Sequence, residues 1–267
     1  LATARRIVII GGGFIGLEIA AVARTLDKEV TVVEAQPRLM PRVVAPVVSA
    51  YFATVHNRHG VRILTAASLV ELDPDPAALR LVVAGGTRLD ADLVVVGIGV
   101  HPNVELAAAA DLDCDGGIVV DEFARTGDPD IVAAGDCTWH RNTLFERPHR
   151  LESVQNAVDQ AKVAAATLLD QPVAYSQVPW FWSDQYDVKL QMAGISSGFD
   201  TAIVRGIPDA GEFSVFYYAG ERVLAVDSIN RPAEHMVARR LIAAGGLLAK
   251  DAAADPAVDL KTIIQKN

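Results

Sequence analysis

The sequence is poor in cysteine. It holds only Cys114 and Cys137, which lie 23 positions apart and form neither a CxxC pair nor a spacing suited to a metal ion. No metal site is therefore expected. With so few cysteines, a reducing cytoplasm is the simplest compartment.

Basic residues and long apolar runs are also scarce. The 24 lysines and arginines are outnumbered by 33 acids, which gives a net charge of −9. This balance argues against nucleic-acid binding, which needs a basic face, but a local basic patch for an acidic protein partner stays possible. No apolar run approaches the roughly 18 residues that cross a bilayer, so no membrane segment is expected. Because the chain opens on Leu1, almost directly before a strand, we interpret it as a fragment.

The first hundred residues predict a βαβ unit within an α/β fold. Residues 6–10 form a continuous β-branched run, typical of a buried parallel strand. Three glycines follow, then a helical pattern over residues 14–26 and a second strand over 29–34. Further buried sequence at 93–96 completes a Rossmann-like domain, which we place at residues 1–101.

The remaining sequence divides into a middle part, residues 102–174, and a C-terminal α+β part, residues 175–267. Helices are expected at 47–59, 103–110, 151–169 and 233–244. Strands are expected at 117–120, 131–134, 190–193, 201–205, 213–218 and 223–226. Residues 61–72 and 80–83 are typical of antiparallel strands, with turns at 73–76 and at Gly85–Gly86.

The glycine cluster carries the first chemical signature, a GxGxxG motif between a strand and a helix. Gly11 permits the tight turn, Gly13 lets a pyrophosphate approach the backbone, and Gly16 lets the helix pack against the strand. Phe14 and Ile15 complete the motif. Free N–H groups at the start of the helix would face the phosphates. The motif predicts a dinucleotide site.

Glu34 ends the second strand, where an acid accepts hydrogen bonds from the hydroxyls of an adenine ribose. Its charge would repel a 2′-phosphate, so the sequence favours NADH over NADPH. Arg38 and Arg42 lie close by, and each is either a phosphate contact or part of a solvated loop. Gly97, Ile98 and Gly99 follow the last buried strand, where an open α/β sheet places ligands.

A second signature runs from Thr126 to Asp136 and ends on Gly135–Asp136. Its spacing resembles the second FAD fingerprint of the two-dinucleotide-domain flavoprotein reductases. The segments 11–18, 34–40, 179–185 and 227–232 narrow the resemblance to ferredoxin reductases of oxygenase systems, over essentially the whole chain. The stretch Trp-Phe-Trp-Ser-Asp-Gln at 180–185 is the most specific part.

This resemblance implies a role for individual residues. Asp136 would bind the ribityl chain of FAD, and the helix start at Ser153–Val154 would face the pyrimidine edge of the flavin. Trp182 would pack by the isoalloxazine ring. Glu18 would lie near the nicotinamide and is the one candidate for a catalytic position. The family's first FAD-binding GxGxxG is not in this chain, so residues 102–174 would be the returning half of a split FAD-binding domain.

The implied function is an NADH-dependent flavoprotein ferredoxin reductase that passes electrons through FAD to a [2Fe–2S] ferredoxin serving a P450 or a dioxygenase. Lys162 and Arg239 are candidate docking residues, and a monomer or weak dimer is expected. Two alternatives stay open. One is a disulfide reductase, although residues 230–235 do not match the His-Pro…Glu pair of that class. The other is a nucleotide-binding module without turnover.

Overall fold

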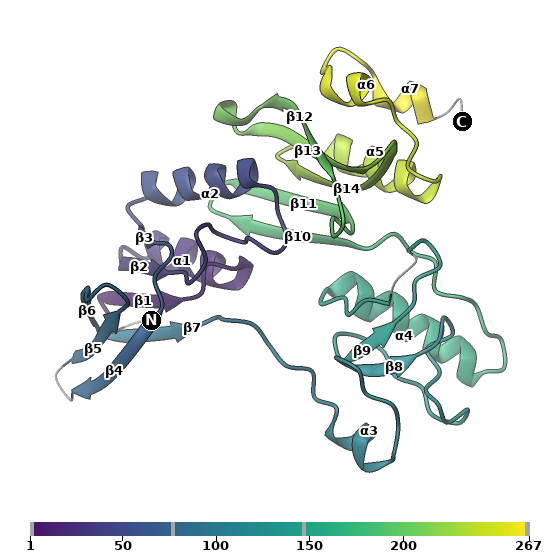
Figure 1. Cartoon of the computed structure of the whole chain (residues 1–267), viewed down its shortest axis with the longest axis horizontal. Coiled ribbons are helices and arrows are strands. Elements are labelled where there is room, and N and C mark those ends of the chain that lie inside the picture. The colour runs from purple at the N-terminus through teal and green to yellow at the C-terminus, as the bar shows by residue number, and fades with distance from the viewer. Residues whose placement is uncertain (1–2, 76–77, 146–147, 265–267) are drawn as a thin grey trace.

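A four-stranded parallel sheet forms the core of the N-terminal part (Figure 1). The computed structural model describes residues 3–75, 78–145 and 148–264. The sheet has the order β3-β2-β1-β7, with β1 at Arg6–Ile10, β2 at Glu29–Val33, β3 at Arg62–Leu64 and β7 at Leu93–Val96. Helix α1 (Phe14–Thr25) packs on one face through residues such as Ala20 and Ala23, so the β-branched strands are buried.

The other face of this sheet packs against a small antiparallel sheet of order β4-β5-β6 (Leu69–Asp75, Ala78–Val83 and Arg88–Ala91). The prediction that 61–72 is one antiparallel strand was wrong. The chain instead breaks after β3 at Ala66, which has a left-handed backbone (φ 51°), and only the second half enters the antiparallel sheet. The expected turn at 73–76 was also misplaced because β4 continues to Asp75; Pro76 lies outside the described residues.

The middle part contains α3 (Glu105–Ala109), β8 (Ile118–Val120), β9 (Thr138–His140) and α4 (Val154–Leu168), with β8 and β9 parallel. In Figure 1 it is joined to the rest by extended connections. The strand expected at 131–134 is absent from the described residues, where Val132 makes an isolated bridge to Arg125. The backbone of this segment makes hydrogen bonds to a nearby loop, for example from Ala133 N to Ala124 O. The strand of this region is instead β9, which begins at Thr138.

The C-terminal part is a five-stranded antiparallel sheet with helices on one face. Its strands follow the order β10-β11-β14-β13-β12. They are β10 (Trp180–Gln185), β11 (Val188–Gly194), β12 (Thr201–Ile207), β13 (Glu212–Ala219) and β14 (Arg222–Ile229); a 3₁₀ turn, η1, spans Pro208–Ala210. Helices α5 (Pro232–Ala243), α6 (Lys250–Ala254) and α7 (Leu260–Ile264) follow.

This C-terminal sheet is buried on both faces. Val226 and Phe216 pack on the α5 side. Leu190 and Tyr217 pack on the opposite side, in one cluster with Leu17 of α1 and Phe52 of α2 (Pro46–Arg58). A shared apolar cluster of this kind fixes the C-terminal sheet against α1 and α2 of the N-terminal part. The division at residues 101 and 174 stays a prediction, and the main parallel sheet, the β8–β9 pair and the five-stranded sheet each fall within one of the three predicted parts.

A buried carboxyl lies in that shared cluster. Ala45 N donates to Tyr217 Oη (2.8 Å), and Tyr217 Oη donates to Asp227 Oδ2. Among the described atoms, Asp227 Oδ1 has no hydrogen-bond partner. Burial raises the pKa of Asp227 to about 7.

The raised pKa predicts how the stability of the chain depends on pH. A carboxyl with a raised folded-state pKa contributes stability that is complete below its unfolded pKa and is lost as pH rises through about 7. We therefore expect Asp227→Asn to gain stability relative to the wild type as pH increases from about 4 to 7, by at most about 1.4 kcal/mol per pH unit. Equilibrium denaturation at several pH values measures this, with the exposed Asp187→Asn as control. A stability difference independent of pH would contradict the prediction.

Candidate dinucleotide-binding site

The glycine turn is a place of close backbone contact. Gly11 has φ +109°, and a Cβ there would lie 2.3 Å from Gly97 O. A Cβ on Gly16 would lie 2.1 Å from Gly11 O, so α1 presses directly on the turn. By contrast, a Cβ on Gly13 would meet nothing within 4 Å. The first and last glycines of the motif are thus required by packing, whereas Gly13 leaves open space for a ligand.

The start of α1 faces that space. Gly13 is the N-cap, and within the described structure no side chain caps the helix there. The N–H groups of a first helical turn carry partial positive charge and suit a phosphate. The open Cβ position and the uncapped helix together fit a dinucleotide pyrophosphate.

Glu34 binds the backbone of its own domain, a role that its position at the end of β2 did not indicate. The side chain is 9% exposed, and its Oε2 accepts from Gly12 N while Oε1 accepts from Gln36 N, each at 2.7 Å. The carboxylate therefore holds the glycine turn through Gly12 N, and its remaining lone pairs are available to a ribose. Gly12, which the motif leaves free, is also constrained, because a Cβ there would lie 2.6 Å from Leu39 Cδ2.

The two nearby arginines have different environments. Arg38 donates to Val44 O and Ser49 Oγ through Nη1 and to Pro41 O through Nη2, so it holds its own loop. Arg42 is exposed. Both line a small cavity of about 150 Å³ that also includes Ser196 and Phe199. Of the two, Arg42 is the one whose side chain is open to a ligand.

The end of β7 presents apolar side chains to solvent. Val96, Ile98 and Val100 are all more than half exposed. Gly99 has φ +121°, and a Cβ there would meet nothing within 4 Å. An exposed apolar run beside the glycine turn is typical of a ligand or interaction surface.

Gly135 and Asp136 lie against α4. Gly135 N donates to Gln160 Oε1 (2.7 Å), and Thr138 Oγ1 donates to the same oxygen (2.9 Å). Asp136 is exposed. At the start of α4, Ser153 Oγ accepts from Asn156 N and caps the helix. The fold thus brings the Gly-Asp turn onto the helix that begins at Val154. Gln160 is a structural partner that no motif indicated.

Strand β10 contacts both the glycine turn and the helix α4 that follows the Gly135–Asp136 turn. Phe181 contacts Phe14 of the glycine motif, with ring centroids 4.8 Å apart. Trp180 N donates to Gln155 Oε1 of α4 (3.0 Å). Trp182, which is 36% exposed, lies beside Trp180 with centroids 5.4 Å apart. Strand β10 therefore contacts both the glycine turn and α4.

Glu18 is held by the C-terminal sheet. Ser183 Oγ of β10 donates to Glu18 Oε1 at 2.5 Å, a contact between residues 165 positions apart. The sequence placed Glu18 only by resemblance, and nothing in its local pattern indicated this partner. One carboxylate oxygen of Glu18 is thereby committed to Ser183.

The candidate docking residues differ in their surroundings. Lys162 Nζ pairs with Asp159 Oδ1 at 2.9 Å and is exposed. The guanidinium of Arg239 lies over the Trp180 ring, 5.1 Å from its centroid. Arg239 is therefore next to the aromatic pair, whereas Lys162 sits in a local ion pair of the kind that contributes little to stability.

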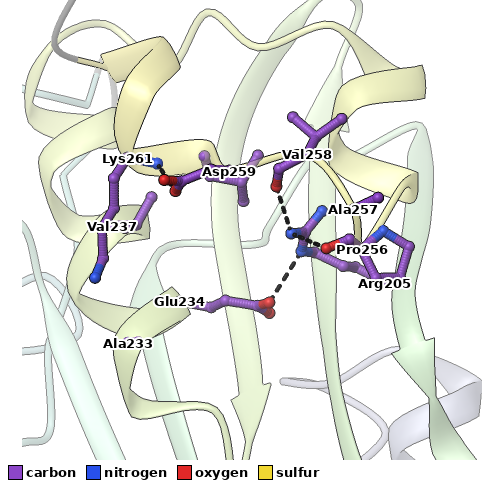
Figure 2. A pocket seen from close by; sticks show the side chains of 10 residues that line it. Arg205, Ala233, Glu234, Val237, Pro256, Ala257, Val258, Asp259 and Lys261 are labelled. Atoms are coloured by element: carbon purple, nitrogen blue, oxygen red, sulfur yellow. Dashed lines mark hydrogen bonds and ion pairs between the residues drawn. The ribbon is translucent and has the colours of Figure 1, made fainter.

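A larger cavity, of about 250 Å³, lies in the C-terminal part (Figure 2). Arg205 enters it from β12 and donates to Glu234 Oε1 (2.9 Å) and Val258 O (2.8 Å). Further acceptors are the carbonyl oxygens of Ala252, Ala253, Asp255 and Pro256. These contacts use all the N–H groups of the guanidinium. We therefore interpret the cavity as a structural feature, in which Arg205 holds the C-terminal tail, residues 252–258, against β12.

The described residues contain no group of three or more histidine, cysteine or acidic residues able to hold a metal ion. Cys114 and Cys137 are both free. No helix in the described part of the chain is long and apolar enough to cross a membrane.

Comparisons with known proteins agree along the whole chain. A family model for pyridine nucleotide-disulphide oxidoreductases matches residues 1–161, and a reductase C-terminal model matches residues 180–264. Rhodocoxin reductase of Rhodococcus erythropolis is 47% identical over 100% of this chain. The ferredoxin–NAD(+) reductase component of an anthranilate 1,2-dioxygenase system, from Burkholderia cepacia, is 46% identical over 99% of it.

A solved structure of a covalent putidaredoxin reductase–putidaredoxin complex superposes with a TM-score of 0.95, at 43% identity over 98% of this chain. The chain spans 63% and 65% of the length of the two curated relatives and 64% of that structure. The resemblance to ferredoxin reductases of oxygenase systems and the mixed α/β fold are thereby confirmed. The roles of the individual site residues stay predictions.

Glu34 is the predicted ribose acceptor and also holds two backbone N–H groups, and Glu34→Ala removes both kinds of contact. A hydrogen bond to a charged group contributes about 1.5–3 kcal/mol, so the affinity for NAD⁺ is expected to fall at least about tenfold. Calorimetry with NAD⁺, which cannot reduce a flavin, on the complete protein measures this affinity, with Glu29→Ala, an exposed acid at the other end of β2, as control. Unchanged NAD⁺ affinity in Glu34→Ala would contradict the prediction.

Proposed function

Because the chain belongs to the pyridine nucleotide-disulphide oxidoreductase family, we propose that it is the nicotinamide-binding and C-terminal portion of an NADH-dependent flavoprotein ferredoxin reductase. The observation that carries this proposal is the similarity of nearly the whole chain, including the C-terminal part, to reductases of oxygenase systems. Since the chain spans less than two thirds of those relatives, the complete protein would carry out the reaction.

The geometry supports a dinucleotide on the glycine turn. Gly13 and the uncapped start of α1 would bind the pyrophosphate, and Glu34 would accept from the adenine ribose. Arg42 would lie at the rim. Glu18 would face the nicotinamide from the second turn of α1, and its carboxylate would orient the ring.

The second half of the site would hold FAD. Asp136 would bind a ribityl hydroxyl, the start of α4 at Ser153–Val154 would direct N–H groups to the pyrimidine edge, and Trp182 would pack by the ring. Gly97, Ile98 and Gly99, at the end of β7, would bring the backbone close to a ring of a bound cofactor. When bound, the flavin would supply the chemistry that accepts a hydride and releases its two electrons one at a time. The protein's own contribution is binding, orientation and electrostatics.

The electron acceptor would be a [2Fe–2S] ferredoxin serving a P450 or a dioxygenase. Arg239, next to the Trp180–Trp182 pair, and Lys162 on α4 would face an acidic partner. We further propose that the protein acts in the cytoplasm as a monomer or weak dimer.

The alternative function, a disulfide reductase, has no support at residues 230–235, the region that corresponds to the proton relay of that class. Glu234 is bound by Arg205, Arg231 and Ser214. His235 is 2% exposed, and burial lowers its pKa to about 4. A glutamate engaged in three hydrogen bonds and a buried neutral histidine are poorly placed to exchange protons with a substrate.

The proposed function is tested on the chain joined to its N-terminal part. Stopped-flow measurements should show flavin reduction by NADH, slower reduction by NADPH at equal concentration, and transfer of electrons to a [2Fe–2S] ferredoxin. Flavin reduction without transfer to any ferredoxin would favour a nucleotide-binding role, and no reduction by either nucleotide would refute the proposal.

Docking is tested with two neighbouring arginines of α5. Arg239→Ala should raise the KM for ferredoxin several-fold, and the effect should shrink at high salt because exposed charges are screened. Arg240→Ala, an exposed residue on the same helix, is the matched control. Equal effects of the two substitutions would remove Arg239 from the docking surface.

A further inference from the structure

A chain of buried polar side chains crosses the interface between α2, β10 and α1. Ser183, Gln185 and His56 are each fully buried at 0% exposure. Gln185 Nε2 lies 3.0 Å from Ser183 Oγ, and Gln185 Oε1 lies 2.8 Å from His56 Nε2. At the far end, Tyr186 Oη lies 3.4 Å from His56 Nδ1. At the near end is the carboxylate of Glu18, 2.5 Å from Ser183 Oγ.

The chemistry of the groups fixes the direction of every hydrogen bond. A carboxylate only accepts, so the Ser183 hydroxyl donates to Glu18 and its lone pair takes the amide N–H of Gln185. The amide oxygen of Gln185 then accepts from His56 Nε2, which leaves Nδ1 to accept from Tyr186. All four donors therefore point toward Glu18. Burial lowers the pKa of His56, which agrees with a neutral ring.

A row of aligned hydrogen bonds that ends on a carboxylate limits the rotation of that carboxylate. Because only Oε1 of Glu18 is bound to Ser183, Oε2 is left to accept from a ligand. Contacts on either side, such as Phe14 with Phe181, set the distance between α1 and β10. Because Ser183, Gln185 and His56 are fully buried, they can act on a ligand only through Glu18.

We propose that Ser183, Gln185 and His56 are positioning residues that fix Glu18 as an oriented acceptor for the carboxamide N–H of the nicotinamide. This inference rests on the proposed function and extends it to nucleotide selection. A carboxylate held in this way distinguishes a carboxamide from a ring substituent of similar size that has no N–H to donate.

The test compares two oxidised nucleotides that do not reduce the flavin, so that binding is measured without turnover. They are NAD⁺ and its 3-acetylpyridine analogue, in which a methyl ketone replaces the carboxamide. Calorimetry on the complete oxidised flavoprotein gives the ratio of the two affinities. In Ser183→Ala the affinity for NAD⁺ should fall about tenfold while that for the analogue stays nearly unchanged, so the ratio should collapse.

Matched variants separate positioning from general destabilisation. Ser228→Ala removes another fully buried hydroxyl of the same sheet and should leave the ratio unchanged. Ser183→Thr keeps the hydroxyl and should restore most of the preference. If Ser183→Ala does not fold, Ser183→Cys, which is similar in volume and a much weaker donor, gives the same comparison.

An unchanged ratio in Ser183→Ala or Ser183→Cys, with NADH still reducing the flavin, would overturn the inference and leave the proposed function intact. A wild-type protein that takes up neither NAD⁺ nor NADH would instead remove the proposed function itself.

The tautomer of His56 gives a second readout that is independent of ligands. Nitrogen-15 shifts of labelled histidine, assigned by comparison with His56→Gln, should show a neutral ring protonated at Nε2. A charged ring or one protonated at Nδ1 would break the order of donors and overturn the inference.

Discussion

The backbone of Gly11 is in close contact with both Gly97 and Gly16. A side chain on Gly11 would overlap the carbonyl oxygen of Gly97, and a side chain on Gly16 would overlap the carbonyl oxygen of Gly11. This contact brings the ends of β1 and β7 and the start of α1 into one small region. The open position at Gly13, the hydrogen bond from Gly12 N to Glu34 and the exposed end of β7 all lie at this turn. A methyl group at Gly11 would push the turn away from β7, and one at Gly16 would push α1 away from the turn.

The C-terminal sheet turns that local geometry into a site shared between distant parts of the chain. One of its faces completes an apolar cluster with α1 and α2, so β10 is placed by packing rather than by its own loop connections. Through β10 the sheet supplies Ser183 to Glu18, Phe181 to Phe14 and the backbone of Trp180 to Gln155. The dinucleotide turn and the Gly-Asp helix are therefore positioned by a common strand.

The elements that sequence reasoning found were those determined by local pattern. The glycine turn, α1 and the antiparallel strands from β11 to β14 follow from periodicity and from glycine placement. Residues 131–134 were expected to be a strand because they are short and apolar, yet their hydrogen bonds go to a neighbouring loop. Likewise, Gln160 and His56 lie in no motif, and the stretch 180–185 did not indicate the hydrogen bonds that Gln185 makes. Their importance arises only when segments far apart in the chain meet, and a single sequence contains no signal for such pairings.

The guanidinium of Arg205 binds five carbonyl oxygens from residues 252–258 as well as the carboxylate of Glu234. It therefore acts as a cross-link that ties the tail to β12, in a chain whose two cysteines form no disulfide. Small domains often fasten such a segment with a sulfur bridge. Under the proposed electron-transfer function a bridge of that kind would be exposed to reduction, whereas an arginine held by peptide oxygens cannot be reduced and would keep the tail in place in either redox state.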